Sequence, residues 1–198
     1  MSAFAAQPLT AVKVFAEAPL EVLDMIRPSS RLDMIDYYTQ ADSLVSVPNA
    51  LGGQSRFEAV SDDYMKVSVT PSSAIEIKIL PYKKSQIVMT LYTVGGDSIA
   101  QDTDVRFFDT DLKPLPVGKF LQMPDAVIFF NLKDSDISLS DFHEWLPFQT
   151  FSLSTGPGET PLSITLTTLR TLPAERRDLL SPLLNPTSTL TWSGSRFK

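Results

Sequence analysis

Residues 55–94 constrain the fold more than any other part of the chain, because apolar and polar side chains alternate along them in successive runs. Met65, Val67 and Val69 occupy alternate positions of one run, and Ile75, Ile77 and Ile79 occupy alternate positions of the next. A period of two is typical of strands with one buried face. Turn-forming residues separate the runs at 70–73 and 81–85. We therefore predict an antiparallel meander of consecutive strands over residues 55–94.

The third run of this segment is apolar on both of its faces. Ile87, Met89 and Leu91 alternate there with Val88, Thr90 and Tyr92. Central strands that are covered on both sides show this pattern, and we expect helices to cover the second face. In the two preceding runs, Lys66, Glu76 and Lys78 are expected on a solvent-facing side, with Lys66 opposite one of the other two.

The segments around the meander predict helices and further strands. Pro19 is expected to begin a helix that ends before Pro28, and Ser29 to cap a second helix. The apolar run 126–130 predicts a buried strand, and residues 188–197 a last strand. Together these patterns predict an α+β fold: a mainly antiparallel β-sheet, with the meander 55–94 at its centre and helices packed on one face.

The charge and residue composition exclude several classes of partner and chemistry. The formal net charge is −6 and no basic run is present, which argues against nucleic acid and anionic membranes as partners. No stretch reaches the roughly 18–20 apolar residues that a membrane span requires, so no transmembrane segment is expected. The chain has no cysteine and a single histidine, His143. We therefore predict no metal site and no cofactor.

The first residues carry a pattern typical of exported proteins. Ala3, Phe4 and Ala5 have the small–any–small form of a signal-peptidase site. We interpret residues 1–6 as the remnant of a signal peptide with a truncated leader, and residues 7–198 as a single α+β domain. The expected location is periplasmic or extracellular. The alternative is an ordinary N-terminus without a targeting role.

Few side chains suggest reaction chemistry. His143, beside Glu144, is the only imidazole available for acid–base catalysis, but a surface or capping role explains it better. The aspartates that follow the meander are more typical of turns than of a calcium loop; they are Asp102, Asp104, Asp109, Asp111, Asp134 and Asp136. We therefore predict no catalytic residues.

Aromatic side chains are the remaining candidates for a binding site. Amphipathic rings are common at surfaces that bind carbohydrates or peptides, and the chain has them throughout, including Trp192. Tyr37, Tyr64, Tyr92 and Trp145 are the candidate binding residues. Packing within strands and helices is the alternative explanation for each of them.

Four short pieces of the chain resemble a known family. They are residues 31–37 (RLDMIDY), 49–55 (NALGGQS), 62–64 (DDY) and 70–73 (TPSS). Together they resemble the domain-of-unknown-function family numbered 3256, a family of exported proteins from Gram-negative gut anaerobes, over nearly the whole chain. The resemblance implies export and carries over no site residues.

These observations favour a non-catalytic exported protein that binds an unknown protein, peptide or glycan partner, or acts as an accessory to one. The ligand and the oligomeric state stay open. One alternative is a carrier that encloses an apolar ligand between sheet and helices, which the apolar run 87–92 suggests. The other alternative is a hydrolase that uses His143.

Overall fold

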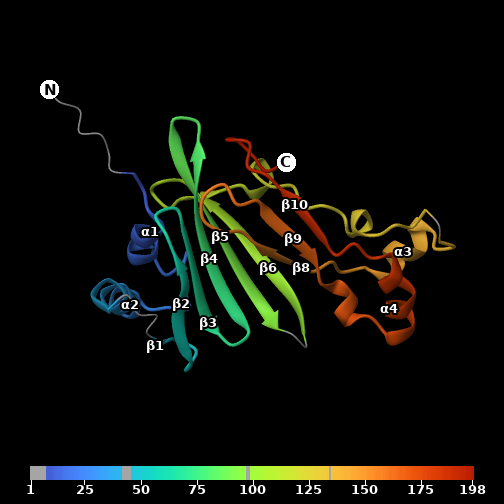
Figure 1. Ribbon diagram of the computed structural model, residues 1–198, viewed down its shortest axis with the longest axis horizontal. Coiled ribbons are helices and arrows are strands. Elements are labelled where there is room, and N and C mark those ends of the chain that lie inside the picture. Colours follow the sequence, from blue (N-terminus) through green and yellow to red (C-terminus); the bar gives the residue numbers. More distant parts are fainter. Residues whose placement is uncertain (1–7, 42–45, 97–98, 134) are drawn as a thin grey trace.

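The computed structural model describes residues 8–41, 46–96, 99–133 and 135–198, so the proposed signal-peptide remnant 1–6 lies outside the described residues. The chain forms a seven-stranded antiparallel sheet in which the strands follow one another in sequence order (Figure 1). Its strands are β1 (Val47–Pro48), β2 (Gln54–Val60), β3 (Tyr64–Thr70), β4 (Ser73–Tyr82), β5 (Ser85–Gly96), β6 (Ile99–Phe108) and β7 (Pro114–Leu115). The α+β class and the antiparallel sheet are therefore confirmed.

The predicted meander is the centre of this sheet. Ile77 of β4 pairs with Met65 of β3 on one side and with Thr90 of β5 on the other. The strands β4 and β5 are the longest pair, and both faces of each contribute buried residues. The edge strands β1 and β7 contain two residues each, and one residue of each is a proline, Pro48 and Pro114.

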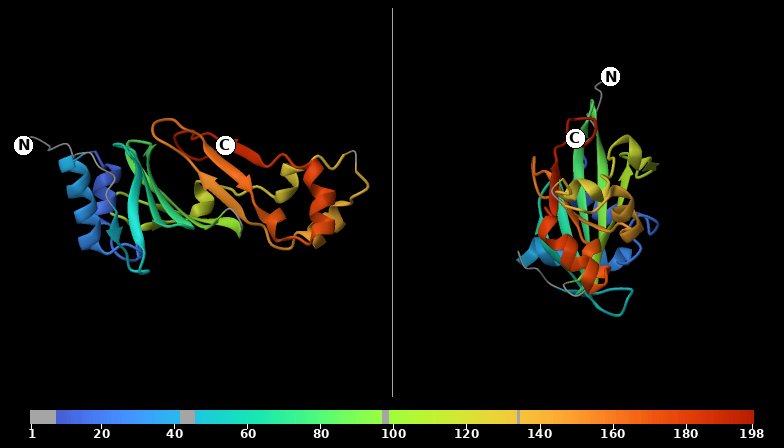
Figure 2. Two further views of the ribbon diagram at one scale, coloured as in Figure 1. Left: turned by 60° about the horizontal axis from the view of Figure 1, so that its bottom comes forward. Right: turned by 90° about the vertical axis from the view of Figure 1, so that its right-hand side faces the viewer.

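Two helices, α1 (Ala11–Glu17) and α2 (Pro28–Ala41), cover one face of the large sheet (Figure 2, left). Thr10 begins α1 by accepting a hydrogen bond from the backbone N–H of Lys13. Between helices and sheet lies a buried apolar core that includes Phe15, Met34, Phe57, Val67, Ile77 and Val88. The prediction of helices packed on one face is thus confirmed.

A buried guanidinium joins the two helices. Arg31 of α2 is 0% exposed, and its Nη1 donates to the carbonyl oxygens of Phe15 at 2.9 Å and Ala18 at 2.6 Å. These carbonyls end α1, where a cation is favourable. Among the described residues, Nε and Nη2 of Arg31 have no hydrogen-bond partner. Burial lowers the pKa of Arg31.

A second sheet, rather than helices, covers the other face of the large sheet. Its strands are β8 (Phe151–Ser154), β9 (Leu162–Leu166) and β10 (Thr187–Leu190), in the order β10–β9–β8. The backbone N–H of Phe151 donates to Asp102, and that of Leu153 donates to Thr103, which fastens β8 to β6. The core between the sheets is rich in phenylalanine and includes Met89, Leu91, Phe107, Phe120, Phe129 and Ile164. Our expectation of helices on this face was wrong.

Short helices complete the end of the molecule away from α1 and α2 (Figure 1). They are α3 (Leu139–Trp145) and α4 (Ala174–Leu180), with the 3-10 turns η1 (Val117–Lys119), η2 (Ala126–Phe129), η3 (Thr168–Thr171) and η4 (Ser181–Leu183) elsewhere along the second half of the chain. Within the four described ranges, no helix is both long and apolar enough to cross a lipid bilayer.

Three expected elements differ from the structure. Pro19 ends α1 instead of beginning a helix, because the residue before a proline disfavours helical geometry. The run 126–130 forms the turn η2, capped by Asp125, in which Ala126 and Phe129 are buried while Ile128 is exposed. The last strand ends at Leu190, and the chain then folds back through a bridge between Trp192 and Phe197.

The shared sheet leads to a prediction about cooperativity. Ile77→Ala and Met89→Ala are each expected to lower the free energy of unfolding by about 2–5 kcal/mol, because each removes buried methyl or methylene groups and leaves a cavity. Since Ile77 and Met89 belong to the cores on opposite faces of one sheet, denaturation followed by circular dichroism should show one transition that both variants shift.

Ile99→Ala serves as the control. Ile99 is 66% exposed, so its truncation is expected to change the free energy of unfolding by no more than about 0.5 kcal/mol. Two separate transitions, each shifted by only one of the core variants, would contradict the prediction of a single domain.

Candidate functional site

A buried polar cluster lies where the second sheet meets β4. Glu76 and Lys78 are only 5% and 3% exposed, although their alternation with isoleucines suggested a solvent-facing side. That expectation was wrong, because the loop 155–160 between β8 and β9 covers them. Of the two partners expected for Lys66, the structure places Glu76 opposite it, but the ion pair of Lys66 is with Glu58, at 3.1 Å.

Lys78 uses all three hydrogen atoms of its ammonium group, two of them to bind this loop and one to bind Asp63. Its Nζ donates to Asp63 Oδ2 at 2.6 Å, to the carbonyl oxygen of Gly156 at 2.8 Å and to that of Gly158 at 2.5 Å. An ammonium group has three N–H donors. Each donor of Lys78 is therefore occupied, and the side chain holds the loop in place instead of offering a nucleophile.

Asp63, in the turn between β2 and β3, is the anionic partner in this cluster. It also accepts hydrogen bonds from the hydroxyl of Ser61 and from the backbone N–H of Gly158. Desolvation alone would raise the pKa of Asp63, but the hydrogen bonds from Lys78 and Ser61, the charge of Lys78 and the Gly158 N–H hold it below its usual range. The carboxylate therefore stays ionised and bridges the large sheet to the loop.

Glu76 binds the start of the same loop. Its Oε2 accepts from the backbone N–H of Thr155 at 3.0 Å, and its side chain is also hydrogen bonded to the buried hydroxyl of Tyr64. Burial raises the pKa of Glu76, and the Thr155 N–H, the charge of Lys66 and the Tyr64 hydroxyl oppose this only in part. Burial also raises the pKa of Tyr64, and the carboxylate of Glu76 adds to the effect.

A pocket of about 340 Å³ opens beside the cluster, in the size range of small-molecule sites. Its apolar wall is formed by Leu80, Pro81, Trp192 and Phe197, and its polar wall by Asp63, Thr155, Glu159, Thr160 and Thr191. Lys78 and Glu76 position the loop that supplies much of the polar wall. The pocket thus combines a ring platform with carboxylates and hydroxyls held on a fastened loop.

Trp192 is fixed as part of the apolar wall. Its indole Nε1 donates to the carbonyl oxygen of Pro81 at 2.8 Å. Its ring packs against Phe197, with ring centroids 5.0 Å apart, and against Phe120 at 6.4 Å. Because these contacts satisfy the indole N–H and hold the ring, Trp192 is a pre-formed platform of the kind that favours binding.

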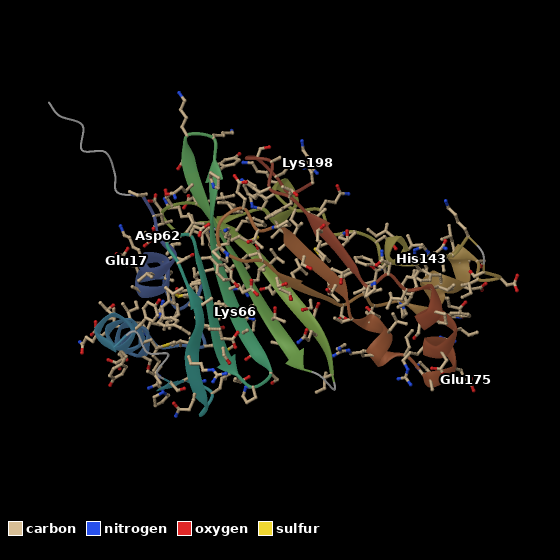
Figure 3. All side chains as sticks on the ribbon, viewed as in Figure 1. Glu17, Asp62, Lys66, His143, Glu175 and Lys198 are labelled. Atoms are coloured by element: carbon tan, nitrogen blue, oxygen red, sulfur yellow. The ribbon has the colours of Figure 1, made fainter. Side chains whose placement is uncertain are left out.

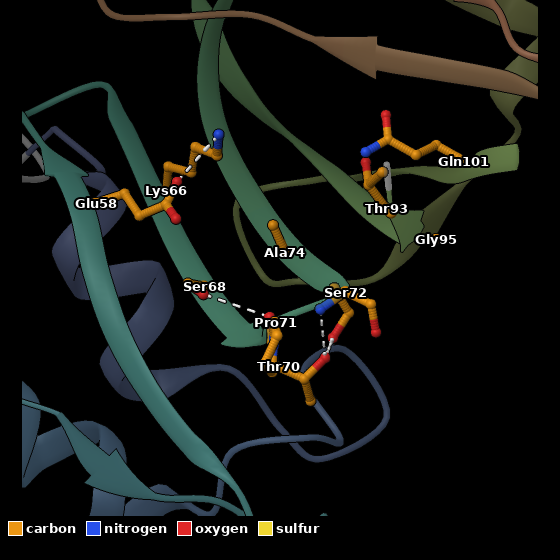
Figure 4. A pocket seen from close by; sticks show the side chains of 12 residues that line it. Glu58, Lys66, Ser68, Thr70, Pro71, Ser72, Ala74, Thr93, Gly95 and Gln101 are labelled. Atoms are coloured by element: carbon orange, nitrogen blue, oxygen red, sulfur yellow. Dashed lines mark hydrogen bonds and ion pairs between the residues drawn. The ribbon is translucent and has the colours of Figure 1, made fainter. Parts of the chain in front are cut away.

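A second, more open groove of about 190 Å³ lies over the exposed part of the large sheet (Figure 4). Its polar groups are largely bonded to one another: Lys66 pairs with Glu58, and Thr70 bonds Ser73 and the N–H of Ser72. At its far rim, Gly95 has φ 106°, and a Cβ there would lie 2.5 Å from the carbonyl oxygen of Ala100. We therefore attribute this groove to two tight turns, one at residues 70–73 and one at Gly95.

The structure does not bring the four predicted aromatic residues together. Tyr37 is exposed on α2, and Tyr92 of β5 borders a small cleft beside Leu23 on the helical face. Trp145 ends α3 and stacks with Arg176, whose guanidinium carbon lies 5.5 Å from the ring centroid. Tyr64 alone joins the polar cluster, and it is buried there. A shared role for these four side chains stays a prediction.

His143 lies on α3, toward the opposite end of the molecule from Glu17 of α1 (Figure 3). Its side chain is 49% exposed, and its Nε2 is 3.5 Å from Asp125 Oδ2. Among the described residues, no serine or threonine hydroxyl bonds to it. The ring thus has a partner to orient it but no nucleophile to activate.

Four of the candidate aspartates, Asp102, Asp104, Asp109 and Asp111, have structural partners. Asp109 accepts from the N–H groups of Asp111 and Lys113 in a turn, and Asp104 pairs with Arg106 at 2.6 Å. Asp102 holds β8. Asp134 lies outside the described residues. Among the residues that the structure describes, no group of three or more histidine, aspartate or glutamate side chains is placed to hold a metal ion.

Sequence reasoning did not single out Asp63, Lys78 or Glu159. The alternation of β4 identifies Lys78 as polar but contains no sign of the loop that covers it. The available signals were the turn-forming sequence Gly156–Pro157–Gly158 and the presence of Trp192 close to the chain end. Neither signal relates these segments to β4 in space.

The raised pKa of Glu76 predicts a pH-dependent stability. The folded protein holds a proton on Glu76 that the unfolded chain releases above the ordinary glutamate pKa of about 4.3. The contribution of Glu76 to the free energy of unfolding therefore falls as pH rises from that value through the raised folded-state pKa. We expect Glu76→Gln to become progressively more stable relative to the unmodified protein over this range, in urea titrations at a series of pH values.

The lowered pKa of Asp63 does not affect the comparison of the two proteins. Its lowered pKa gives stability that is lost as pH falls through the folded-state value, below about 3.9, and this loss is common to both proteins. Glu21→Gln, which removes the carboxyl group of an exposed residue, is the matched control. An equal pH dependence of the Glu76→Gln and Glu21→Gln differences would refute the assignment.

Comparison with known proteins places the chain in a family. No curated protein matches it. A solved structure, "Structure of a domain of an uncharacterized protein from Porphyromonas gingivalis W83", is similar with a TM-score of 0.80 and 22% identity, over 94% of this chain and 96% of that one. This likeness shows the fold, and an origin in gut anaerobes stays a prediction. A family model matches residues 3–197, and the chain therefore belongs to the family described as Protein of unknown function (DUF3256).

Proposed function

We propose that this protein is a non-catalytic binding protein that holds a saccharide unit in the pocket beside Trp192. The observation that carries the proposal is the presence, in one pocket, of a fixed indole ring and of hydroxyl and carboxylate groups, three of which come from the loop 155–160. A sugar ring has an apolar C–H face and a rim of hydroxyl groups. The two walls of the pocket match these two properties.

The chemistry of the polar wall favours a glycan over a peptide. Thr191 offers a side-chain hydroxyl, and Asp63 and Glu159 offer carboxylate oxygens. The hydroxyls of Thr155 and Thr160 donate to carbonyl oxygens within the loop and therefore offer their oxygens as acceptors. Extended peptides are more often bound through a row of backbone groups on a strand edge. The pocket is instead lined by loop residues and by side chains of β4, a strand paired on both sides.

The lining also supports a polar ligand over a purely apolar one. The apolar side chains of the run 87–92 pack in the two cores or at their borders. This packing explains why the run is apolar on both faces, without a cavity for an apolar ligand. Polar groups supply about half of the residues that line the pocket. The polar wall thus favours a ligand with hydroxyl groups, and the apolar-carrier alternative keeps weaker support.

A role in binding fits the state of the ionisable groups beside the pocket. Lys78 has each donor occupied, and Asp63 is ionised and paired. Catalytic acids and bases need a proton or lone pair free to transfer. The cluster is better suited to hold a loop than to move protons.

The first experiment uses the two tryptophans of the chain. In a Trp145→Phe background, Trp192 is the only tryptophan, and titration with neutral oligosaccharides is expected to change its fluorescence. Trp192→Ala should weaken binding by about tenfold or more, as loss of a central aromatic contact does, when measured by calorimetry.

Trp145→Ala is the matched control for this experiment, because Trp145 borders a different pocket beside Arg176. It is expected to leave the affinity unchanged. Circular dichroism and melting curves of each variant separate loss of binding from loss of fold. Absence of binding to every oligosaccharide, or equal losses for both alanine variants, would contradict the proposal.

We further propose that the protein is exported. The motif of Ala3, Phe4 and Ala5 supports this, as does the export that the family resemblance implies. The expected mature protein in its source cells begins after residue 5 or 6, which mass spectrometry of its N-terminal peptide would detect. A mature chain that retains Met1 or Ser2 would exclude cleavage at this site.

A further inference from the structure

The tip of the β4–β5 hairpin carries a group of lysines around one tyrosine. The hairpin projects from the body of the molecule (Figure 1, the green hairpin at the top). Lys83 Nζ lies 5.2 Å from the ring centroid of Tyr82. Lys119, from η1, brings a second ammonium to 5.5 Å from the same centroid. Lys84 follows Lys83 in the turn and is exposed.

These lysines have no acidic partner in the part of the chain that the structure describes. Lys66, Lys78 and Lys113 each have a carboxylate within 4.0 Å, whereas Lys83, Lys84 and Lys119 have none. This contrast occurs in a chain with a net charge of −6. Two ammonium groups beside one ring repel each other, and an anion bound between them would offset that repulsion.

The hydroxyl of Tyr82 takes part in this group. Desolvation alone would raise the pKa of Tyr82, but its hydrogen bond with Lys119 and the charges of Lys119 and Lys83 outweigh that effect and hold the pKa below its usual range. The phenol therefore lies in a positive local potential. Ammonium and hydroxyl donors around one point are well suited to an oxyanion.

The lysine group adjoins the pocket. Pro81, which lines the pocket, is the neighbour of Tyr82 in β4. The ring of Tyr82 packs on Phe120 at 5.5 Å, and Phe120 packs on Trp192 at 6.4 Å. Trp192 also donates to the carbonyl oxygen of Pro81, so the lysine group and the pocket are neighbours at this end of β4.

We infer that the natural ligand is an acidic saccharide, and that Lys83 and Lys119 bind its carboxylate or sulfate group while the pocket beside Trp192 holds a sugar ring. The inference rests on the proposed function, since it names the class of glycan for the same site. Charge complementarity selects the acidic class, because Lys83, Lys84 and Lys119 have no carboxylate partner among the described residues and lie around Tyr82, next to the pocket residue Pro81, on a protein with a net charge of −6.

The test compares a sulfated glycosaminoglycan oligosaccharide, a polygalacturonate oligosaccharide and a neutral dextran oligosaccharide of equal length, by calorimetry on the full chain. At least one acidic oligosaccharide is expected to bind about tenfold more tightly than dextran at low salt, as a few charge pairs allow. This excess should disappear as ionic strength rises, because the screening length falls below about 10 Å above 0.1 M salt.

The double variant Lys83→Gln with Lys119→Gln is expected to remove the excess while leaving dextran binding unchanged. The matched control is Lys13→Gln with Lys133→Gln, which removes two exposed lysines elsewhere and should keep the excess. Equal binding of acidic and neutral oligosaccharides, or equal losses in both double variants, would overturn the inference. Tighter binding of an oligonucleotide or of polyglutamate than of either acidic saccharide would overturn it as well.

The oligosaccharide titrations and the variants together distinguish this inference from the proposed function. If dextran binds and depends on Trp192 but the acidic oligosaccharides gain nothing, the inference fails and the proposed function stands. If the acidic oligosaccharides bind through Lys83 and Lys119 while Trp192→Ala changes nothing, the lysine site stands and the pocket proposal fails.

Discussion

The attachment of one loop to the ammonium group of Lys78 is the interaction on which the site depends. Taking an ammonium out of water costs several kcal/mol, and charged hydrogen bonds each return about 1.5–3 kcal/mol. Lys78 makes three of these bonds, and two of its acceptors are carbonyls of the loop between β8 and β9. The charge can be buried only while that loop is in place, so the loop and the second sheet are coupled to β4.

The large sheet serves as a common wall for two different interiors. One face of β4 and β5 packs isoleucine and valine against two helices, and the other face packs methionine, leucine and phenylalanine against a second sheet. The polar residues Glu76 and Lys78 interrupt this second interior toward one end. The pocket forms there because the apolar packing between the sheets gives way to a hydrogen-bonded loop.

Periodicity was sufficient to predict the meander, because Ile75, Ile77 and Ile79 need a partner layer whatever that layer is. Periodicity was not sufficient to predict the environment of Lys78. An alternating polar residue gives the same sequence pattern whether it donates hydrogen bonds to water or to a buried carbonyl oxygen. The run 126–130 shows a related limit: a short apolar stretch suits a buried strand or a buried turn. The pocket joins Asp63, Lys78 and Trp192 across most of the chain length, a relation that local patterns do not contain.

The prolines of β1 and β7 have a consequence for assembly. The outermost strands of the seven-stranded sheet contain two residues each, one of which lacks a backbone N–H, so neither β1 nor β7 readily templates an incoming chain. The small sheet is different, because β10 forms its outer border with Thr187, Ser188, Thr189 and Leu190 and contains no proline. Strand addition, where it occurs, is therefore favoured at β10 over β1 and β7.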